Sequence, residues 1–443
     1  MSIKKIPMHE YITRRKQFLQ KMGSCSVAII PAATTKVRNL DSEYPYRQDS
    51  DFLYLTGFNE PEAILVLIPN RKEGETILFC RPKDSVAEQW EGSRLGPEDA
   101  VTHLKIDQAF AINDFHQQVI ALLDGTDYLF YGFGNQKRLD HQITDAIKFL
   151  KRNERRGKIA PTHIISPDYF LHEMRVIKSA AEIATMQAAN DITTDAHQRA
   201  MKACKPGMFE YELEAEIQHE FLRQGARFLA YNSIVASGNN GCILHYCENN
   251  AQIKPQDLVL IDAGCEMDGY AADITRTFPA GGTFSSEQKA LYEIVLMAQQ
   301  AAIEMIQPGC LWSAIQDTVI RVMTEGLMSL NILTGALDDL IAKNAIKPFY
   351  MHGHGHFLGL DVHDVGQLRC RPDNKWITLR SGMVLTVEPG LYIAYNQTEV
   401  DEKWRGTGIR IEDNILVTDK GCTVLSQRLP KTIADIEALM RAN

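Results

Sequence analysis

Two aspartates, Asp262 and Asp273, lie in the stretch LVLIDAGCEMDGYAADITRTF (residues 258–278), in which two apolar, β-branched runs flank a turn candidate. This pattern is typical of a β-hairpin. If the turn is centred between Met267 and Asp268, the two aspartates lie directly opposite each other and project from one face. Because opposed like charges destabilise a hairpin unless a positive charge lies between them, the pair indicates a bound cation.

A second pair of carboxylates, Glu388 and Glu412, lies in the last fifth of the chain. The segment SGMVLTVEPGLY is typical of a strand that ends at Glu388. In GTGIRIEDNILVT, the alternation predicts a strand with Arg410, Glu412 and Asn414 on one face. Charged residues in strands this apolar are costly to bury unless they are paired or bind a metal. Each half of the C-terminal region therefore offers two carboxylates.

Between the two pairs lies the histidine segment, HGHGHFLGLDVHD, which runs from His352 to Asp364. It holds four of the chain's thirteen histidines, among glycines that let the backbone approach a ligand closely. A single histidine is more often structural, but four histidines so close together favour a binding or catalytic site.

These groups together predict a metal site with hydrolytic chemistry. Four carboxylates carry a charge of −4, which two divalent cations would cancel, whereas without cations the carboxylates would raise one another's pKa. Oxygen ligands with one imidazole and no thiolate suit Mn²⁺ better than structural Zn²⁺, and they leave cobalt, iron and zinc open. Two such ions about 3.5–4 Å apart can share a water and lower its pKa toward neutrality. The target is an amide or a phosphodiester, and the acidic composition slightly favours the amide.

The elements that position these residues follow an α/β region. From residue 1 to about 172, helix-like segments alternate with apolar runs of strand length, which predicts an α/β layer domain. Within it, the segment from Ser42 to Ala63 is equally compatible with a packed loop and with a binding role. A basic segment followed by two prolines places the join between Arg152 and Met174. We therefore expect domains at residues 1–172 and 173–443.

The second of these domains shows an internal repeat. Ser179 with Glu182, and Ser285 with Gln288, form capping-box signatures, and each opens a helix-like run that ends at a Pro-Gly pair. A further helix-like segment and strands follow each Pro-Gly pair. This order predicts a duplicated unit, in which each half supplies one pair of carboxylates.

Composition argues against several classes of protein. With 47 basic and 56 acidic residues, the net charge of −9 is spread along the chain and does not favour a nucleic-acid partner. We find no secretory signal and no apolar run of transmembrane length, so no membrane partner is expected. Nine cysteines without a CxxC pair do not favour a disulfide framework or a thiolate zinc site, and a reducing cytoplasm is the expected compartment.

The motifs resemble those of a known family. The hairpin aspartates, the pattern HGHGHxxGxxxHD, the EPG strand and the GIRIEDN strand look like those of the pita-bread metallopeptidases, which include methionine aminopeptidase, prolidase, aminopeptidase P and creatinase. The segments DSEYPYRQDSDFLYLTGFNEPEA and EQWEGSRLG are similar to those of its bacterial aminopeptidase P branch. This resemblance covers nearly the whole chain. It implies an α/β N-terminal domain followed by an α+β pita-bread domain with a pseudo-twofold duplication.

The resemblance also implies roles for individual residues. Two divalent metal ions, Mn²⁺ in the family, would be bound by Asp262, Asp273, His356, Glu388 and Glu412, with Asp273 and Glu412 bridging both ions. A hydroxide that bridges the metals would attack the peptide bond, Glu388 would shuttle the proton, and His363 would hold the scissile carbonyl. The remaining positions implied by the resemblance are His352 and His245 in the substrate cleft, and Tyr392 and Arg410 as pocket residues or supports of the ligands.

The activity implied by the resemblance is that of an Xaa-Pro aminopeptidase, which removes the N-terminal residue from peptides with proline second. An Xaa-Pro bond has no N–H and therefore needs an apolar, shape-matched pocket. A prolidase, which cuts only dipeptides, is the alternative enzyme, and a non-catalytic pita-bread binding protein is a less favoured one. Because the family uses its N-terminal domain for subunit contacts, a homo-oligomer (dimer or tetramer) is expected, with Trp90 as a candidate contact.

Overall fold

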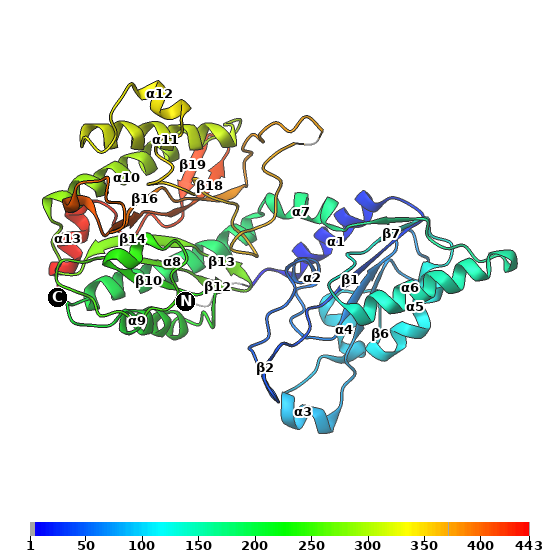
Figure 1. Cartoon of the computed structure of the whole chain (residues 1–443). Coiled ribbons are helices and arrows are strands. Elements are labelled where there is room, and N and C mark those ends of the chain that lie inside the picture. Colours follow the sequence, from blue (N-terminus) through cyan, green and yellow to red (C-terminus); the bar gives the residue numbers. More distant parts are fainter. Residues whose placement is uncertain (1–4, 371, 443) are drawn as a thin grey trace. The chain divides into compact units, whose positions relative to one another are not determined.

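The structure is a computed structural model that describes residues 5–370 and 372–442. It divides into two compact units, one from Ile6 to Arg175 and the other from Val176 onward (Figure 1). The expected division lay three residues earlier, at residue 172. Each unit is described separately below.

A six-stranded sheet in the order β6-β5-β4-β1-β7-β8 forms the centre of the N-terminal unit. Its strands are β1 (Ser26–Pro31), β4 (Ile64–Leu67), β5 (Thr76–Cys80), β6 (Gln108–Ala111), β7 (Tyr128–Phe130) and β8 (His163–Ile165). The sheet is mixed, because β1 pairs antiparallel with β4 and parallel with β7. The helices are α1 (Met8–Met22), α2 (Ser50–Thr56), α3 (Ser85–Glu91), α4 (Gly96–Leu104), α5 (Phe115–Leu123), α6 (Lys137–Arg152) and α7 (Asp168–Val176).

Helices cover both faces of this sheet. Val27 of β1 shares a core with Phe115 of α5 and Ile143 of α6. The alternation along β7 turns Phe130 to the other face, where its ring centroid lies 6.3 Å from that of Phe18 in α1. The α/β layer domain predicted for this region is therefore confirmed.

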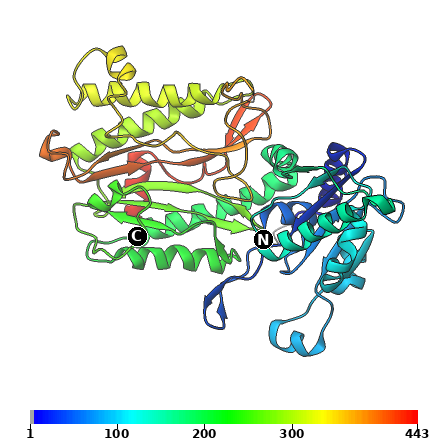
Figure 2. The same ribbon diagram turned by 45° about the vertical axis from the view of Figure 1, so that its right-hand side comes forward.

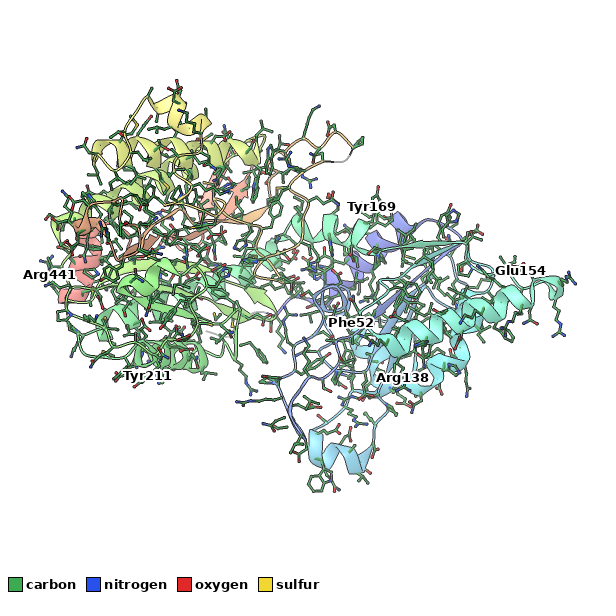
Figure 3. The ribbon with its side chains drawn as sticks, viewed as in Figure 1. Phe52, Arg138, Glu154, Tyr169, Tyr211 and Arg441 are labelled. Atoms are coloured by element: carbon green, nitrogen blue, oxygen red, sulfur yellow. The ribbon has the colours of Figure 1, made fainter. Side chains whose placement is uncertain are left out.

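The segment from Ser42 to Ala63 is mostly packed into this unit. It contains α2, which is capped by Asp49, whose carboxylate lies 2.9 Å from the amide nitrogen of Phe52. The Phe52 side chain, labelled in Figure 3, is fully buried. Buried Gln48 donates to the carbonyl of Phe58. The segment thus contains a small helical element, and its first two residues form β3 (Ser42–Glu43), which pairs with the preceding β2 (Val37–Asn39) in a short exposed hairpin.

Strands lie between two pairs of packed helices in the C-terminal unit (Figures 1 and 2). One pair is α8 (Ala180–Ala203) with α9 (Glu210–Arg223), and the other is α10 (Ser286–Glu304) with α11 (Trp312–Ser329). The short helices α12 (Leu337–Ala342) and α13 (Ile433–Arg441) follow. Both predicted capping boxes are present at the starts of α8 and α10. The repeated order of helices and strands is as the sequence predicts.

Each half of this unit contributes a three-stranded antiparallel sheet, β10-β11-β14 and β15-β18-β19. The two-stranded sheet β16-β17 and the three-stranded sheet β13-β12-β9 complete the strand layer. The bounds are β9 (Phe228–Leu229), β10 (Ile234–Ser237), β11 (Leu258–Ala263), β12 (Cys265–Met267), β13 (Tyr270–Ala271), β14 (Ile274–Pro279), β15 (Val384–Val387), β16 (Gly390–Ile393), β17 (Thr407–Arg410), β18 (Asp413–Thr418) and β19 (Gly421–Val424).

The predicted hairpin is present, but its turn lies one residue further along the chain. Asp262 of β11 pairs with Thr275 of β14, and β12 and β13 continue the same register. This register centres the turn on Asp268 and Gly269, whose φ angles are +45° and +87°, as in the type I′ turns of two-residue hairpins. The prediction of directly opposed aspartates is therefore wrong. Asp273 lies two residues before Thr275, so it shares a face with Asp262 on a diagonal.

Candidate metal centre

One cavity of about 650 Å³ in the C-terminal unit is lined by all five predicted metal ligands. Asp262 lies in β11 and His356 in the histidine segment, whereas Asp273 directly precedes β14, Glu388 directly follows β15 and Glu412 directly precedes β18. Ligand atoms of Asp273, His356 and Glu412 all lie within 4.8 Å of one another. The carboxylate of Glu388 is 3.6 Å from His356 Nε2. Residues more than a hundred positions apart are thus brought together.

His356 presents one defined nitrogen to the carboxylates. Its Nδ1 lies 2.9 Å from the carbonyl oxygen of Phe357, so Nδ1 carries a hydrogen and donates it. Nε2 lies 3.4 Å from Asp273 Oδ2 and is the atom available to a cation. Burial opposes a charge on this ring, but the hydrogen bond to Asp273 and the charges of Asp273 and Glu388 prevail and raise its pKa to about 9.

The carboxylates of the cavity are held together against their own repulsion. Burial, with the charges of Asp273 and Asp262, raises the pKa of Glu388 to about 7. Burial and neighbouring carboxylates likewise raise the pKa of Asp273 and, more strongly, that of Glu412. Such a cluster of oxygen donors with one imidazole and no thiolate fits divalent cations, which would balance its charge.

Arginines do not neutralise Asp273 and Glu412, the two carboxylates to which the family resemblance gives a bridging role. Arg410 donates to Asp262 Oδ2 at 2.7 Å, and Arg276 pairs at 2.7 Å with Asp413. Among the described residues, neither Asp273 nor Glu412 has an arginine or lysine within ion-pair distance. Asp273 and Glu412 are therefore not ordinary salt-bridge partners of Arg276 or Arg410.

Tyr392 lies behind the cavity wall. Its side chain is 2% exposed and is not among the lining residues. Its hydroxyl accepts from Arg410 Nη1 at 3.1 Å and lies 2.8 Å from His352 Nε2. The other ring nitrogen of His352 lies 2.8 Å from the carbonyl of Gly353. Tyr392 thus connects the wall histidine to the arginine that holds Asp262.

The four histidines of the histidine segment divide into two groups. His352, His356 and His363 line the cavity, as does His245 from outside the segment. His354 instead packs against Trp312, with 4.8 Å between ring centroids, and is 1% exposed. Burial lowers the pKa of His354 to about 3, so it is a neutral core residue. His363, by contrast, is exposed in the cavity, 4.3 Å from the His356 ring between centroids.

One residue of the cavity was missed in the sequence. The hydroxyl of Tyr231 lies 2.5 Å from an oxygen of Asp262 and 2.5 Å from an oxygen of Asp273. Its single proton can be donated to only one of them at a time, so it bridges the pair. Tyr231 stands outside any motif, just before β10, and no local signal marks it. Asn414, by contrast, could be found from the alternation, since it shares a face with Glu412, and it hydrogen-bonds the peptide of Asp273 on both sides.

Backbone segments approach each other closely beside the ligands. A Cβ atom on Gly264, across the hairpin from Asp273, would lie 1.8 Å from the carbonyl oxygen of Ala272. We expect Gly264→Ala to lower the free energy of unfolding by at least about 2 kcal/mol and to reduce metal content, because only backbone movement can relieve this overlap. Gly421→Ala, at a glycine with open space around it, is the control. Equal melting temperatures of the two metal-loaded variants would contradict the prediction.

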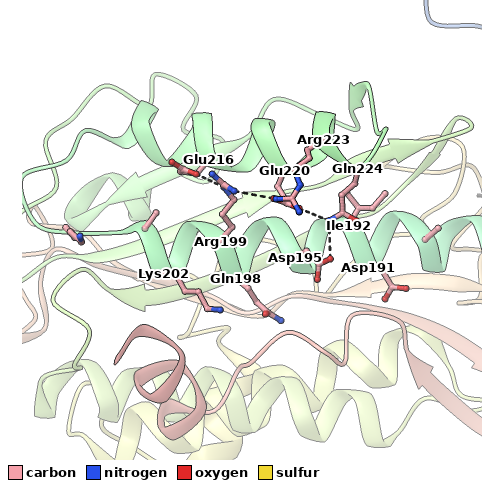
Figure 4. A pocket seen from close by; sticks show the side chains of 13 residues that line it. Asp191, Ile192, Asp195, Gln198, Arg199, Lys202, Glu216, Glu220, Arg223 and Gln224 are labelled. Atoms are coloured by element: carbon pink, nitrogen blue, oxygen red, sulfur yellow. Dashed lines mark hydrogen bonds and ion pairs between the residues drawn. The ribbon is translucent and has the colours of Figure 1, made fainter. Parts of the chain in front are cut away.

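A second cavity, of about 1020 Å³, lies between α8 and α9 (Figure 4). Some of its charged side chains pair with one another: Arg199 lies 2.5 Å from Glu216 and 3.5 Å from Glu220. Gln224 donates to Asp195 at 3.1 Å. None of the predicted site residues lines this cavity, so its size does not make it the site.

Comparison with known proteins defines the class of this protein. Residues 184–419 match the model of metallopeptidase family M24, and residues 11–131 match that of the aminopeptidase P N-terminal domain. The chain belongs to metallopeptidase family M24. The Xaa-Pro aminopeptidase of Escherichia coli (strain K12) is 48% identical over 99% of this chain and 98% of that protein. That of Haemophilus influenzae is 45% identical over 98% of each.

Solved structures agree with these matches. Aminopeptidase PepP of Pseudomonas aeruginosa superposes with a TM-score of 0.97 at 50% identity, covering 99% of both chains. Zinc-substituted aminopeptidase P of Escherichia coli in complex with product gives 0.96 at 48% identity, with the same coverage. Within the family the chain is an aminopeptidase of the aminopeptidase P type. The family, the two-domain fold and the enzyme class expected from the sequence are confirmed.

Proposed function

We propose that the 650 Å³ cavity is where this enzyme releases the N-terminal residue from peptides whose second residue is proline. The observation that carries this proposal is the convergence of Asp273, His356 and Glu412 within 4.8 Å in a chain of family M24. The proline preference is supported by the relatives of Escherichia coli and Haemophilus influenzae, both of which are Xaa-Pro aminopeptidases.

The cavity fits two divalent cations, which we take to be Mn²⁺. Its donors are four carboxylates and the Nε2 atom of His356, a set that suits hard cations. The residues that would hold them are Asp262, Asp273, His356, Glu388 and Glu412, all of which line the cavity. When bound, the cations supply the Lewis acidity that activates water and polarises the scissile carbonyl.

The protein's own groups then move protons and hold the substrate. Glu388 lines the cavity beside His356 and would carry a proton from the attacking water to the proline nitrogen, which needs one when the bond breaks. An N–H of His363 would donate to the carbonyl oxygen. His245 and His352 form walls of the cleft. Since both nitrogens of His352 already face protein groups, this ring would offer its carbon face to the substrate.

Metal analysis combined with a peptide assay tests the proposal. The enzyme should contain divalent metal and should cleave an Xaa-Pro-Xaa tripeptide promptly. Chelation should abolish cleavage, and Mn²⁺ should restore it. An enzyme that cleaves an Xaa-Pro dipeptide but leaves the tripeptide intact is instead a prolidase, and chelator-insensitive turnover would refute the metal site.

We also place the enzyme in a reducing cytoplasm. All nine cysteines are free in the structure, as expected where thiols stay reduced. Among the described residues, no helix combines the length and the apolar character needed to cross a membrane.

The exposed tip of the N-terminal unit is the proposed contact for a dimer or tetramer. The β2–β3 hairpin and α3 both project from its lower end (Figures 1 and 2), and Leu40 and Trp90 there are 96% and 86% exposed. Large apolar side chains that are this exposed, on segments that project from the unit, are candidates for an interaction surface. We expect Trp90→Ala to weaken assembly and to change the kinetics with a proline peptide. Light scattering and turnover that both match the parent would contradict this, and Tyr169→Ala, at another exposed aromatic residue of the same unit, is the control.

A further inference from the structure

A buried ion pair joins the start of the C-terminal unit to the histidine segment. Lys178 Nζ lies 2.9 Å from Asp364 Oδ2, and each side chain is 1% exposed. The two residues are 186 positions apart in the chain. Lys178 lies just before α8, and Asp364 directly follows His363. Moving two charges out of water is unfavourable, so a buried ion pair adds little net stability. Its presence therefore indicates a role other than stabilising the fold.

His363 itself has little local support. Residues 358–368 contain no helix or strand, and the His363 side chain is exposed in the cavity. Its backbone is held through its neighbour, since the amide of Asp364 donates to the carbonyl of Phe357 at 2.9 Å. The run from Phe357 to Asp364 is thus a closed loop, and the carboxylate of Asp364 fixes its end.

Both ends of the ion pair are fitted to their surroundings. A Cβ atom on Gly359, within the same loop, would lie 2.1 Å from Asp364 Oδ2 and 3.1 Å from Lys178 Cε, so this glycine leaves the room that the pair occupies. On the other side, the amide of Lys178 donates to the carbonyl of Gly382 at 2.8 Å. Lys178 is therefore itself anchored to the backbone just before β15, the strand that leads to Glu388.

We propose that Lys178, through its buried ion pair with Asp364, is a positioning residue that holds the His363 imidazole at the cavity wall beside His356. The inference rests on the proposed role of His363 and adds the group that places it. A loop without regular structure would otherwise let the peptide between residues 363 and 364 rotate and carry the ring away from the substrate. Misplacement of a catalytic group by about 1 Å can cost on the order of 10²-fold in rate.

The first test is the variant Lys178→Met, which keeps the length of the side chain and removes its charge. With metal content equal to the parent, we expect kcat for an Xaa-Pro-Xaa peptide to fall by about 10- to 100-fold and KM to change little. A merely structural role would lower stability but leave kcat per metal-loaded site unchanged. If Lys178→Met does not fold, the double variant Lys178→Met, Asp364→Leu replaces it, because this variant leaves no lone buried charge. We expect the same fall in its kcat at equal metal content.

Lys289→Met serves as the control, because Lys289 pairs with Glu437 at 3.1 Å near α13 and does not line the cavity. Its kcat should match that of the parent.

The second test combines the change with His363→Ala. If Lys178 acts through His363, Lys178→Met should lower kcat by less than about twofold in the His363→Ala background, because the ring it positions is gone. Losses that multiply in the combined variant, or an unchanged kcat in Lys178→Met, would overturn the inference. An unchanged kcat in His363→Ala alone would instead refute the proposed role of His363, so the two failures are distinguishable.

Discussion

Glu412→Gln is expected to leave a folded protein whose kcat/KM for a proline peptide is reduced by at least about 10³-fold. Glutamine keeps the size of the side chain and the hydrogen bond from Thr275, which lies 2.7 Å from Glu412 Oε2. What it removes is one negative charge from the group formed with Asp273 and His356. Metal content per chain, measured by elemental analysis, should fall together with turnover.

Stability separates this result from simple damage to the fold. Burial and the charges of Asp273 and Glu388 raise the pKa of Glu412 well above its usual range, so an ionised Glu412 opposes folding when no cation is bound. The metal-free Glu412→Gln protein should therefore melt at a higher temperature than the metal-free parent, while the order reverses with Mn²⁺. Glu216→Gln, at a glutamate paired with Arg199, is the control. Full activity in Glu412→Gln would refute the ligand assignment.

The second large effect is a loss of stability with rising pH that is much larger without metal than with it. The pKa of Glu388 is raised from 4.5 to about 7, so between these values the folded protein binds more protons than the unfolded chain. The free energy of unfolding of the metal-free protein therefore falls as pH rises, and the ionisation of Glu388 lowers it by about 3 kcal/mol once the pH is above 7. The pKa of His356 is raised from 6.5 to about 9, and its contribution, present below pH 6.5, is lost on approach to pH 9. Both groups therefore act in the same direction.

Thermal unfolding of chelated and Mn²⁺-loaded protein at pH 5, 6, 7 and 8 measures this effect. The chelated protein should lose melting temperature with each step. The loaded protein should lose much less, since bound cations keep the carboxylates ionised. Glu388→Gln in the chelated state should flatten the curve between pH 5 and 7. A chelated parent whose melting temperature rises over this interval would contradict the assignment of a repulsive carboxylate cluster.

Much of the candidate site could be predicted because its proposed ligands are polar residues in places where strands are otherwise apolar. Asp262, Glu388 and Glu412 stand out for this reason, and all three line one cavity. The predicted hairpin register differs from the observed one by one residue because the turn forms at Asp268 and Gly269, an Asp-Gly pair that favours a type I′ turn, and not at Met267 and Asp268. The predicted register makes the two aspartates directly opposed, whereas the structure has them on a diagonal, but both registers keep them on one face.

Other features could not be predicted because they depend on long-range packing. Tyr231 meets its two aspartates from a segment without any motif. Nothing local distinguishes His354, which packs on Trp312, from the cavity histidines two residues away on either side. The placement of Tyr392 behind His352 likewise follows from the pairing of β16 with β17, which sets Tyr392 opposite Gly408.

The tight turn at Asp268 and Gly269 also restricts how this enzyme's lineage can vary. Side chains alternate along each arm, so one inserted or deleted residue between Ala263 and Asp273 would rotate that aspartate to the far side of the sheet while Asp262 stayed in place. Substitutions there are tolerable wherever the side chains point away from the cavity. A change in length by a single residue is not tolerable. Descendants of this gene should therefore differ in which residues occupy this stretch but keep the number of residues between the two aspartates.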